Sequence, residues 1–113
     1  MPQRYVLDYL ELPSTDGPAM QTFMADAFGW AHTGYGPEYT AIHAGLEVGI
    51  DSSSERPPAP LPVIRAEDLD EAEQDITAAG GTITVPQFDY PGGRRFHFRS
   101  PGGVDFAVYI DKA

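Results

Sequence analysis

Arg95, His97 and Arg99 alternate along one short segment and could do chemistry together. Alternate side chains of a β-strand point to the same face, so these three would share a face while Phe96 and Phe98 take the other. A guanidinium binds an anionic group through two parallel hydrogen bonds. A histidine has an ordinary pKa of about 6.5 and can act as a general base near neutral pH. The segment therefore predicts a site in which two arginines bind an anion such as a carboxylate, with a histidine base between them.

A simpler interpretation of the same residues stays open. The two arginines could pair with carboxylates of the chain and line a polar surface, and His97 could be structural or solvent-exposed. The carboxylates available for such pairs are Glu11, Glu47 and Asp105. Both interpretations place the arginines on a polar face of the sheet.

Strand alternation brings candidates from other segments to this face. Tyr9 and Tyr109 could stack on a planar ligand or hydrogen-bond to it, and they could equally fill the sheet. The Glu11 carboxylate would need a partner or water there, and it could form an acid–base pair with His97. Glu11 and His97 are thus the catalytic candidates. The candidate ligand-binding residues are Tyr9, Glu11, Glu47, Arg65, Arg95, His97, Arg99, Asp105 and Tyr109.

The other histidines and an acidic run are interpreted as structural. His32 follows the first predicted helix and His43 lies on a predicted hairpin, and neither has a matched partner, so we expect no ligand role for them. The acidic run over 67–71 lies at a predicted helix N-terminus, where the helix dipole favours carboxylates. We expect it to serve capping and solubility.

These candidates are positioned by a pattern that occurs twice along the chain. Each copy begins with a strand and a polar pair that opens a helix, Thr15-Asp16 in the first copy and Glu67-Asp68 in the second. Each helix ends near glycine, and each copy closes with a glycine turn followed by alternating residues. The copies span about 4–51 and about 62–113, and a Ser- and Pro-rich linker over about 52–61 joins them.

Hydrophobic periodicity locates the elements within each copy. Strands are expected at 4–12, 39–43, 46–51, 61–66, 82–85, 94–99 and 104–110. On the first strand, Asp8 is the polar exception on an otherwise apolar side. Residues 34–37 are expected to form a turn and residues 88–93 a loop. The buried stripes of the two helices are expected to be Met20, Phe23, Met24, Ala27 and Phe28, and Leu69, Ala72, Ile76 and Ala79.

Composition narrows the class of protein and partner. The chain has 113 residues, enough for one compact domain, and 42% of them are hydrophobic. Seven basic residues stand against seventeen acidic ones, giving a formal net charge of −10. This balance argues against nucleic acid and anionic membranes as partners. Cysteine is absent, which excludes disulfides and thiol chemistry. No run approaches the roughly 20 apolar residues of a membrane span, and no signal-peptide core is present, so we expect a soluble cytoplasmic protein.

The order of elements and four short motifs resemble the vicinal oxygen chelate superfamily, which includes glyoxalase I, bleomycin-resistance proteins, fosfomycin-resistance enzymes and extradiol dioxygenases. The motifs are Phe28-Gly29-Trp30, Asp68-Leu69-Asp70 with Ala72, Ala79-Gly80-Gly81, and Ser100-Pro101-Gly102-Gly103. The resemblance covers essentially the whole chain. It implies an α+β fold in which two βαβββ modules form a cupped mixed β-sheet, with helices on the outer face and a ligand cavity inside. It also implies a homodimer.

In the metalloenzymes of that superfamily, four inward strand positions hold a metal through His, Gln or Glu. Alignment of the two copies places these positions at Tyr9, Gly49, Leu61 and Ala107, which supply no good ligand. A slip of two residues would place Leu7, Glu47 or Asp105 there instead, and one carboxylate alone does not hold a catalytic metal. The resemblance therefore implies a member that uses no metal and no other cofactor.

Three functional hypotheses follow from this resemblance. The leading one is a metal-independent protein that binds and sequesters a small molecule, as the bleomycin-resistance type does. The alternative is a glyoxalase-like lyase, isomerase or dioxygenase-related enzyme that acts on a small molecule in the same cavity. The third is a dimeric accessory module with no ligand.

Overall fold

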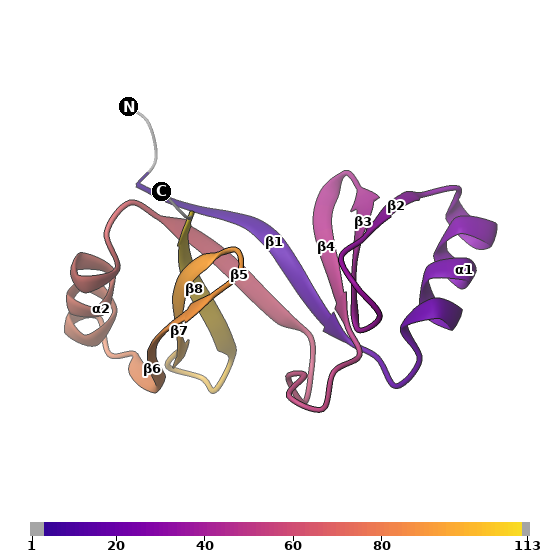
Figure 1. The fold of residues 1–113 in the computed structure, drawn as a ribbon. Coiled ribbons are helices and arrows are strands. Elements are labelled where there is room, and N and C mark those ends of the chain that lie inside the picture. The colour runs from indigo at the N-terminus through magenta and orange to yellow at the C-terminus, as the bar shows by residue number, and fades with distance from the viewer. Residues whose placement is uncertain (1–3, 112–113) are drawn as a thin grey trace. The chain divides into compact units, whose positions relative to one another are not determined.

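The structure is a computed structural model that describes residues 4–111 (Figure 1). Its elements in chain order are β1 (Tyr5–Pro13), α1 (Gly17–Phe28), β2 (Ala31–Gly34), β3 (Tyr39–Ala44), β4 (Leu46–Asp51), β5 (Leu61–Ala66), α2 (Leu69–Ala78), β6 (Thr82–Tyr90), β7 (Gly93–Arg99) and β8 (Asp105–Asp111). Neither helix of the described chain is long and apolar enough to span a membrane.

The described chain divides into two compact units. The N-terminal unit comprises residues 9–61, and the C-terminal unit comprises residues 4–8 together with 62–111. Strand β1 therefore contributes its first residues to one unit and the rest to the other. The strand order is β2-β3-β4-β1 in the N-terminal unit and β6-β7-β8-β5 in the C-terminal unit. The two units thus share one topology.

In each unit the first and last strands are parallel and the remaining neighbours are antiparallel. The parallel pairs have the same register, because Glu11 faces Gly49 in the N-terminal unit and Val63 faces Ala107 in the C-terminal unit. Parallel pairing requires a long connection, and in each unit this connection consists of a helix and two strands. The predicted α+β fold of two βαβββ repeats with mixed strand pairing is confirmed.

Helix α1 covers one face of the N-terminal unit. Asp16 caps the helix, with its Oδ1 accepting a hydrogen bond of 3.0 Å from the Ala19 amide, and Gly29 ends it with a left-handed φ of 72°. The buried core beneath the helix consists of Met24, Ile42, Val48 and Ile50.

The predicted buried stripe of α1 is only partly right. Met24 is buried, but Phe23 and Phe28 are 57% and 56% exposed. Met20 and Met24 are one turn apart and face the strands, whereas Phe23 and Phe28 flank that line. The Phe28 ring instead lies 4.8 Å from the Trp30 ring and 6.0 Å from the Phe23 ring, centroid to centroid. These three rings form an aromatic cluster on the surface.

Helix α2 covers one face of the C-terminal unit. Asp68 Oδ1 caps it by accepting a 3.0 Å hydrogen bond from the Glu71 amide. At its end the Gly81 amide donates to the Ile76 carbonyl and the Gly80 amide to the Thr77 carbonyl, with Gly80 at a φ of 101°. The buried core of this unit is Ala66, Leu69, Ala72, Phe96, Phe98 and Val108.

The strand predictions missed β2 and ended β6 too early. The four residues of β2 are all exposed and show no apolar alternation, so periodicity does not indicate a strand there. Strand β6 continues to Tyr90, where a loop over 88–93 was expected. It carries Pro86 and two register irregularities, between Ile83 and Val85 and between Val85 and Phe88, and these interrupt the period of two.

The cap of α1 gives a direct test of this local structure. Asp16→Ala removes the acceptor for the Ala19 amide and should lower the free energy of unfolding by about 1 kcal/mol. The matched control is Asp26→Ala in the same helix, which removes an exposed carboxylate and should change stability by less than about 0.5 kcal/mol. Urea denaturation of the two variants measures the difference. Equal stabilities of the two variants would contradict the assigned cap.

Candidate functional site

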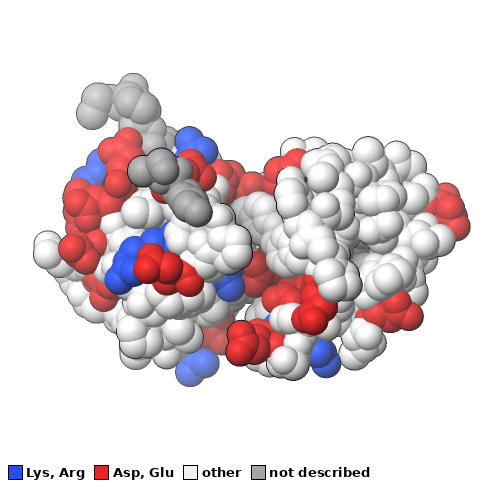
Figure 2. Space-filling view, viewed as in Figure 1, with Lys and Arg blue, Asp and Glu red and all other residues white. Residues whose placement is uncertain are grey.

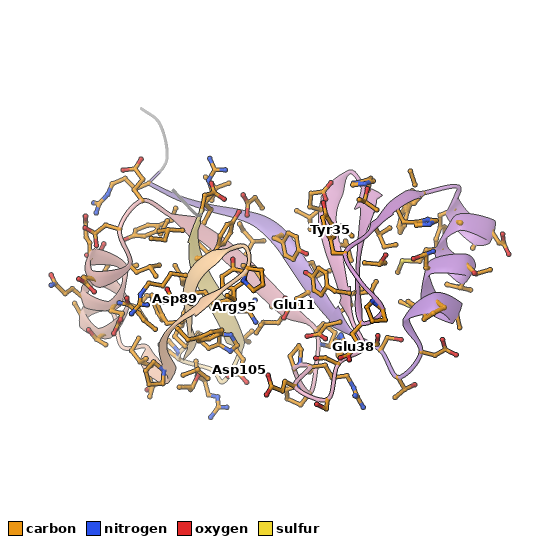
Figure 3. All side chains as sticks on the ribbon, in the orientation of Figure 1. Glu11, Tyr35, Glu38, Asp89, Arg95 and Asp105 are labelled. Carbon is orange, nitrogen blue, oxygen red and sulfur yellow. The ribbon has the colours of Figure 1, made fainter. Side chains whose placement is uncertain are left out.

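Six of the nine candidate residues share one face of the C-terminal unit. Phe96, Phe98 and Val108 pack with α2, so the residues that alternate with them face the other way. Across β7 and β8, Arg95 pairs with Tyr109, His97 with Ala107, and Arg99 with Asp105. Figure 3 shows Arg95 on the side of β7 away from α2. The six residues are Arg65, Arg95, His97, Arg99, Asp105 and Tyr109.

Two aromatic residues of β6 complete this face. The Arg95 guanidinium carbon lies 5.4 Å from the centroid of the Phe88 ring and 5.2 Å from that of the Tyr90 ring. The Phe88 ring also meets the His97 ring edge-on, at 5.8 Å between centroids. We refer to Phe88, Tyr90, Arg95 and His97 as the β6–β7 cluster. The sequence analysis missed Phe88 and Tyr90 because it assigned them to a loop, although their spacing of two is typical of one strand face.

His97 is half-buried, and its environment keeps the ring neutral. Burial of the ring, and next the positive charge of Arg95, lower the pKa of His97 to about 4, while Asp105 opposes this shift. The Nε2 atom of the ring is buried and makes no hydrogen bond to any residue in 4–111. A buried ring nitrogen of this kind can give or take a hydrogen bond with a ligand.

Arg99 is engaged with its neighbour across the strands. Its Nε donates to Asp105 Oδ1 at 2.8 Å and its Nη2 to Asp105 Oδ2 at 3.3 Å. This hydrogen bond is the main cause that lowers the pKa of Asp105. Arg65 similarly lies 3.6 Å from the Asp111 carboxylate, between Nη1 and Oδ2. A ligand would meet either arginine only in competition with a carboxylate of the chain.

Tyr109 forms a hydrogen bond with the first strand, β1. Its hydroxyl donates to Asp8, at 3.1 Å from Oδ1 and 3.0 Å from Oδ2. Burial, and next this carboxylate, raise the pKa of Tyr109. The contact explains why a polar residue stands at position 8 among apolar neighbours, because Asp8 belongs to the C-terminal unit and serves Tyr109 there.

The remaining candidates, Tyr9, Glu11 and Glu47, lie in the N-terminal unit. Glu11 is 4% exposed and stands opposite Gly49, and Tyr9 stands opposite Glu47. The Tyr9 hydroxyl is in hydrogen-bonding contact with the hydroxyl of Tyr39, a residue that the sequence analysis did not select. A glycine inside a strand often marks a close approach of another group. Gly49 is therefore the feature of the sequence that could have indicated this tyrosine contact.

Glu47 lies on the surface and pairs with His43. The distance between His43 Nδ1 and Glu47 Oε1 is 2.9 Å, and His43 Nε2 lies 2.9 Å from the Thr33 hydroxyl. His32 Nε2 lies 2.8 Å from the amide nitrogen of Gln21. Both histidines thus have hydrogen-bond partners, which strand pairing and helix packing supply, and the expectation that they have no ligand role stays a prediction.

The structure describes the surroundings of Gly49 and Ala107, two of the positions that the resemblance assigned to metal ligands. A Cβ atom at Gly49 would overlap the hydroxyls of Tyr9 and Tyr39, so no ligand side chain fits there. Ala107 is fully buried opposite Val63. Within residues 4–111, no group of three His, Cys, Asp or Glu side chains could hold a metal ion. The side chains at these positions therefore do not fit a divalent cation.

Comparison with known protein families places the chain in a known class. The model of the Glyoxalase/Bleomycin resistance protein/Dioxygenase superfamily matches residues 6–108, and the chain belongs to this superfamily. No curated protein matches the sequence.

Solved structures share the fold. A hypothetical protein from Bacillus halodurans C-125 is similar with a TM-score of 0.80 and 14% identity, over 98% of this chain and 97% of that chain. Methylmalonyl-CoA epimerase from Mycobacterium tuberculosis has a TM-score of 0.72 and 11% identity, over 95% and 88%. The Mn(II)-bound glyoxalase from Novosphingobium aromaticivorans has a TM-score of 0.67 and 23% identity, over 94% and 38%. At these identities the likeness shows the fold alone.

Because the Tyr9 and Tyr39 hydroxyls occupy the space beside Gly49, a side chain at this position should lower the stability of the fold. Gly49→Ala should lower the free energy of unfolding by about 1–3 kcal/mol because the new methyl group overpacks against the two hydroxyls. Adding Tyr39→Phe removes one of the clashing oxygens and should recover part of the loss. Gly34→Ala is the control, since its Cβ would come no closer than 3.8 Å to the Thr40 hydroxyl. Thermal or urea unfolding of the four proteins checks this, and equal losses at positions 34 and 49 would contradict it.

The neutral state of His97 predicts a pH dependence. Between about pH 6.5 and pH 4 the unfolded chain binds a proton at His97 that the folded chain does not, so stability should fall as the pH falls through this window. For a half-buried ring we expect a loss of about 1–2 kcal/mol after solvent screening. His97→Gln should remove this part of the dependence. Urea unfolding at several pH values, together with NMR titration of the ring, tests it, and a ring that titrates near pH 6.5 would contradict it.

Proposed function

We propose that this protein binds a small organic molecule without a metal and sequesters it rather than converting it. The proposed binding surface is the β6–β7 cluster and the polar residues beside it. The ligand class that suits this surface is a planar or aromatic molecule that carries an anionic group. We propose that the protein works as a cytoplasmic homodimer with no cofactor.

The observation that carries this proposal is the Arg95 guanidinium beside two aromatic rings and a buried imidazole nitrogen. The rings hold the guanidinium in one region by cation–π attraction, which reduces the entropy lost on binding. A guanidinium attracts a carboxylate or another anion, and the rings offer a surface for stacking. The neutral imidazole adds a hydrogen bond that does not depend on pH near neutrality.

The ionisation of the site favours binding over acid–base catalysis. A general base is most effective when its pKa lies near the working pH, and a pKa of about 4 makes His97 a weak base at pH 7. The pKa of Tyr109 is raised and its hydroxyl donates to Asp8, so the phenol keeps its proton near neutral pH and does not act as a base. These features support the sequestering hypothesis over a lyase or isomerase that uses His97.

Metal independence is supported by the closed position at Gly49 and by the alanine at position 107. The test is elemental analysis of untagged protein after incubation with nickel, zinc, manganese and iron(II) and desalting. We expect far less than one equivalent of each metal. Near-stoichiometric metal would overturn the metal-free proposal and restore a metalloenzyme.

Ligand binding can be tested with simple probes. We expect a panel of aromatic carboxylates, such as benzoate and cinnamate, to shift the backbone NMR signals of β6 and β7, and benzamide to bind more weakly because it lacks the charge. Arg95→Gln should weaken carboxylate binding about tenfold, the equivalent of one charge-assisted hydrogen bond. Arg4→Gln, at an exposed ion pair with Glu71, is the charge-matched control. Equal affinity of Arg95→Gln and wild type would place any binding elsewhere.

A further inference from the structure

A hollow lies within the N-terminal unit, and none of its lining residues belongs to the candidate site described above. Its volume is about 420 Å³, within the usual range for small-molecule pockets. It lies between the end of β1 and the segment that follows β4. The lining residues are Pro13, Ser14, Thr15, Ser54, Arg56, Pro57 and Pro58. Three of the lining residues carry a hydroxyl group and one carries a guanidinium, and none of them is acidic.

The charge of this lining is opposite to that of the unit around it. Arg56 is the sole Lys or Arg in residues 9–61. The same stretch holds seven acidic residues: Glu11, Asp16, Asp26, Glu38, Glu47, Asp51 and Glu55. Figure 2 shows how strongly acidic side chains outnumber basic ones on the visible face of the molecule. A hollow lined by the one cation of an acidic unit is a local exception that favours an anionic occupant.

The walls of the hollow are held in place by Asp51. Its backbone carbonyl accepts from the Ser14 amide at 3.0 Å, and its Oδ1 accepts from the Ser53 amide at 2.9 Å. Both walls are therefore fixed to the end of β4. Proline at three of the seven lining positions restricts the backbone further. The hollow is pre-organised, which lowers the entropic cost of binding.

The orientation of Arg56 is fixed by hydrogen bonds to Ser53. Its Nη1 donates to the Ser53 carbonyl at 3.0 Å, and its backbone amide donates to the same carbonyl at 3.3 Å. One Nη1 hydrogen bond uses one of the five donors of the guanidinium. The other donors of this planar group remain available for a second acceptor. The carboxylates of Asp16 and Asp51 nearby accept from the Ala19 and Ser53 amides, respectively.

We infer that this hollow binds the phosphate group of a small ligand. A tetrahedral oxyanion offers oxygens in several directions, which suits three hydroxyl donors from two walls and a guanidinium from one of them. A planar carboxylate would engage the guanidinium but fewer of the hydroxyls. The neighbouring Asp16 and Asp51 carboxylates repel an anion, so we expect a modest affinity for phosphate alone, with a Kd of about 1 mM. This Kd should rise with the salt concentration, because salt screens the attraction to the guanidinium.

The test is an NMR titration of the ¹⁵N-labelled full chain with inorganic phosphate at fixed pH and ionic strength. The expected result is saturable shifts of the amide signals of Ser14, Thr15, Ser54 and Arg56. Arg56→Gln should raise the Kd at least about tenfold, because it removes the charge-assisted hydrogen bonds. Arg4→Gln removes one positive charge in the C-terminal unit and should leave the Kd unchanged. An unchanged melting temperature of Arg56→Gln shows that the variant is folded.

Two further ligands identify the source of the phosphate. Methyl phosphate that binds as tightly as inorganic phosphate supports the phosphomonoester of an organic molecule as the ligand, and inorganic phosphate that binds alone supports the free ion. Acetate that matches phosphate, shifts that do not saturate, or an Arg56→Gln variant with wild-type affinity would each overturn the inference.

Discussion

The parallel pairing of the first and last strands of each repeat is the constraint on which the rest of the structure depends. A parallel neighbour cannot be reached by a tight turn, so the chain must make a long connection. Here that connection includes a helix, which covers one face of the strands. Val48 and Ile50 in one unit, and Phe96 and Val108 in the other, pack on the face that the helix covers. Because side chains alternate along a strand, their neighbours lie on the other face. The candidate site residues of the strands therefore lie on the face without a helix. The equal register of the two pairs gives both units this division at equivalent positions.

The two units use this face in different ways. The N-terminal unit closes it at Gly49, where two tyrosine hydroxyls fill the space that a side chain would take. The C-terminal unit keeps charge on it and balances most of that charge internally, through Arg99 with Asp105 and Arg65 with Asp111. The same fold thus carries an aromatic, hydroxyl-rich face in one repeat and an ion-paired face in the other. The divergence lies in side chains, since strand order and register agree.

The fold was predictable from sequence where apolar residues alternate or recur at helical spacing. The strands around Val48 and Val108 and both helix caps followed from such patterns and from Asp16 and Asp68. The short exposed strand β2 and the irregular strand β6 were missed because neither shows a regular period. The contacts that define the site were harder still. Tyr39 against Tyr9, Phe88 against Arg95 and Tyr109 against Asp8 each depend on which strands become neighbours, and a single sequence does not specify that pairing.

Strand β1 links the halves of the chain in a way that the repeat alone does not suggest. Its first residues supply Tyr5, whose hydroxyl lies 2.5 Å from Asp75 of α2, and Asp8, which accepts from Tyr109. The two repeats share one topology, yet the C-terminal unit includes the first residues of β1, the strand that begins the first repeat. A polypeptide cut in the segment between β4 and β5 would give a C-terminal piece that lacks these partners. The two units are therefore not interchangeable, because Tyr5 and Asp8 of β1 are part of the fold of the C-terminal unit.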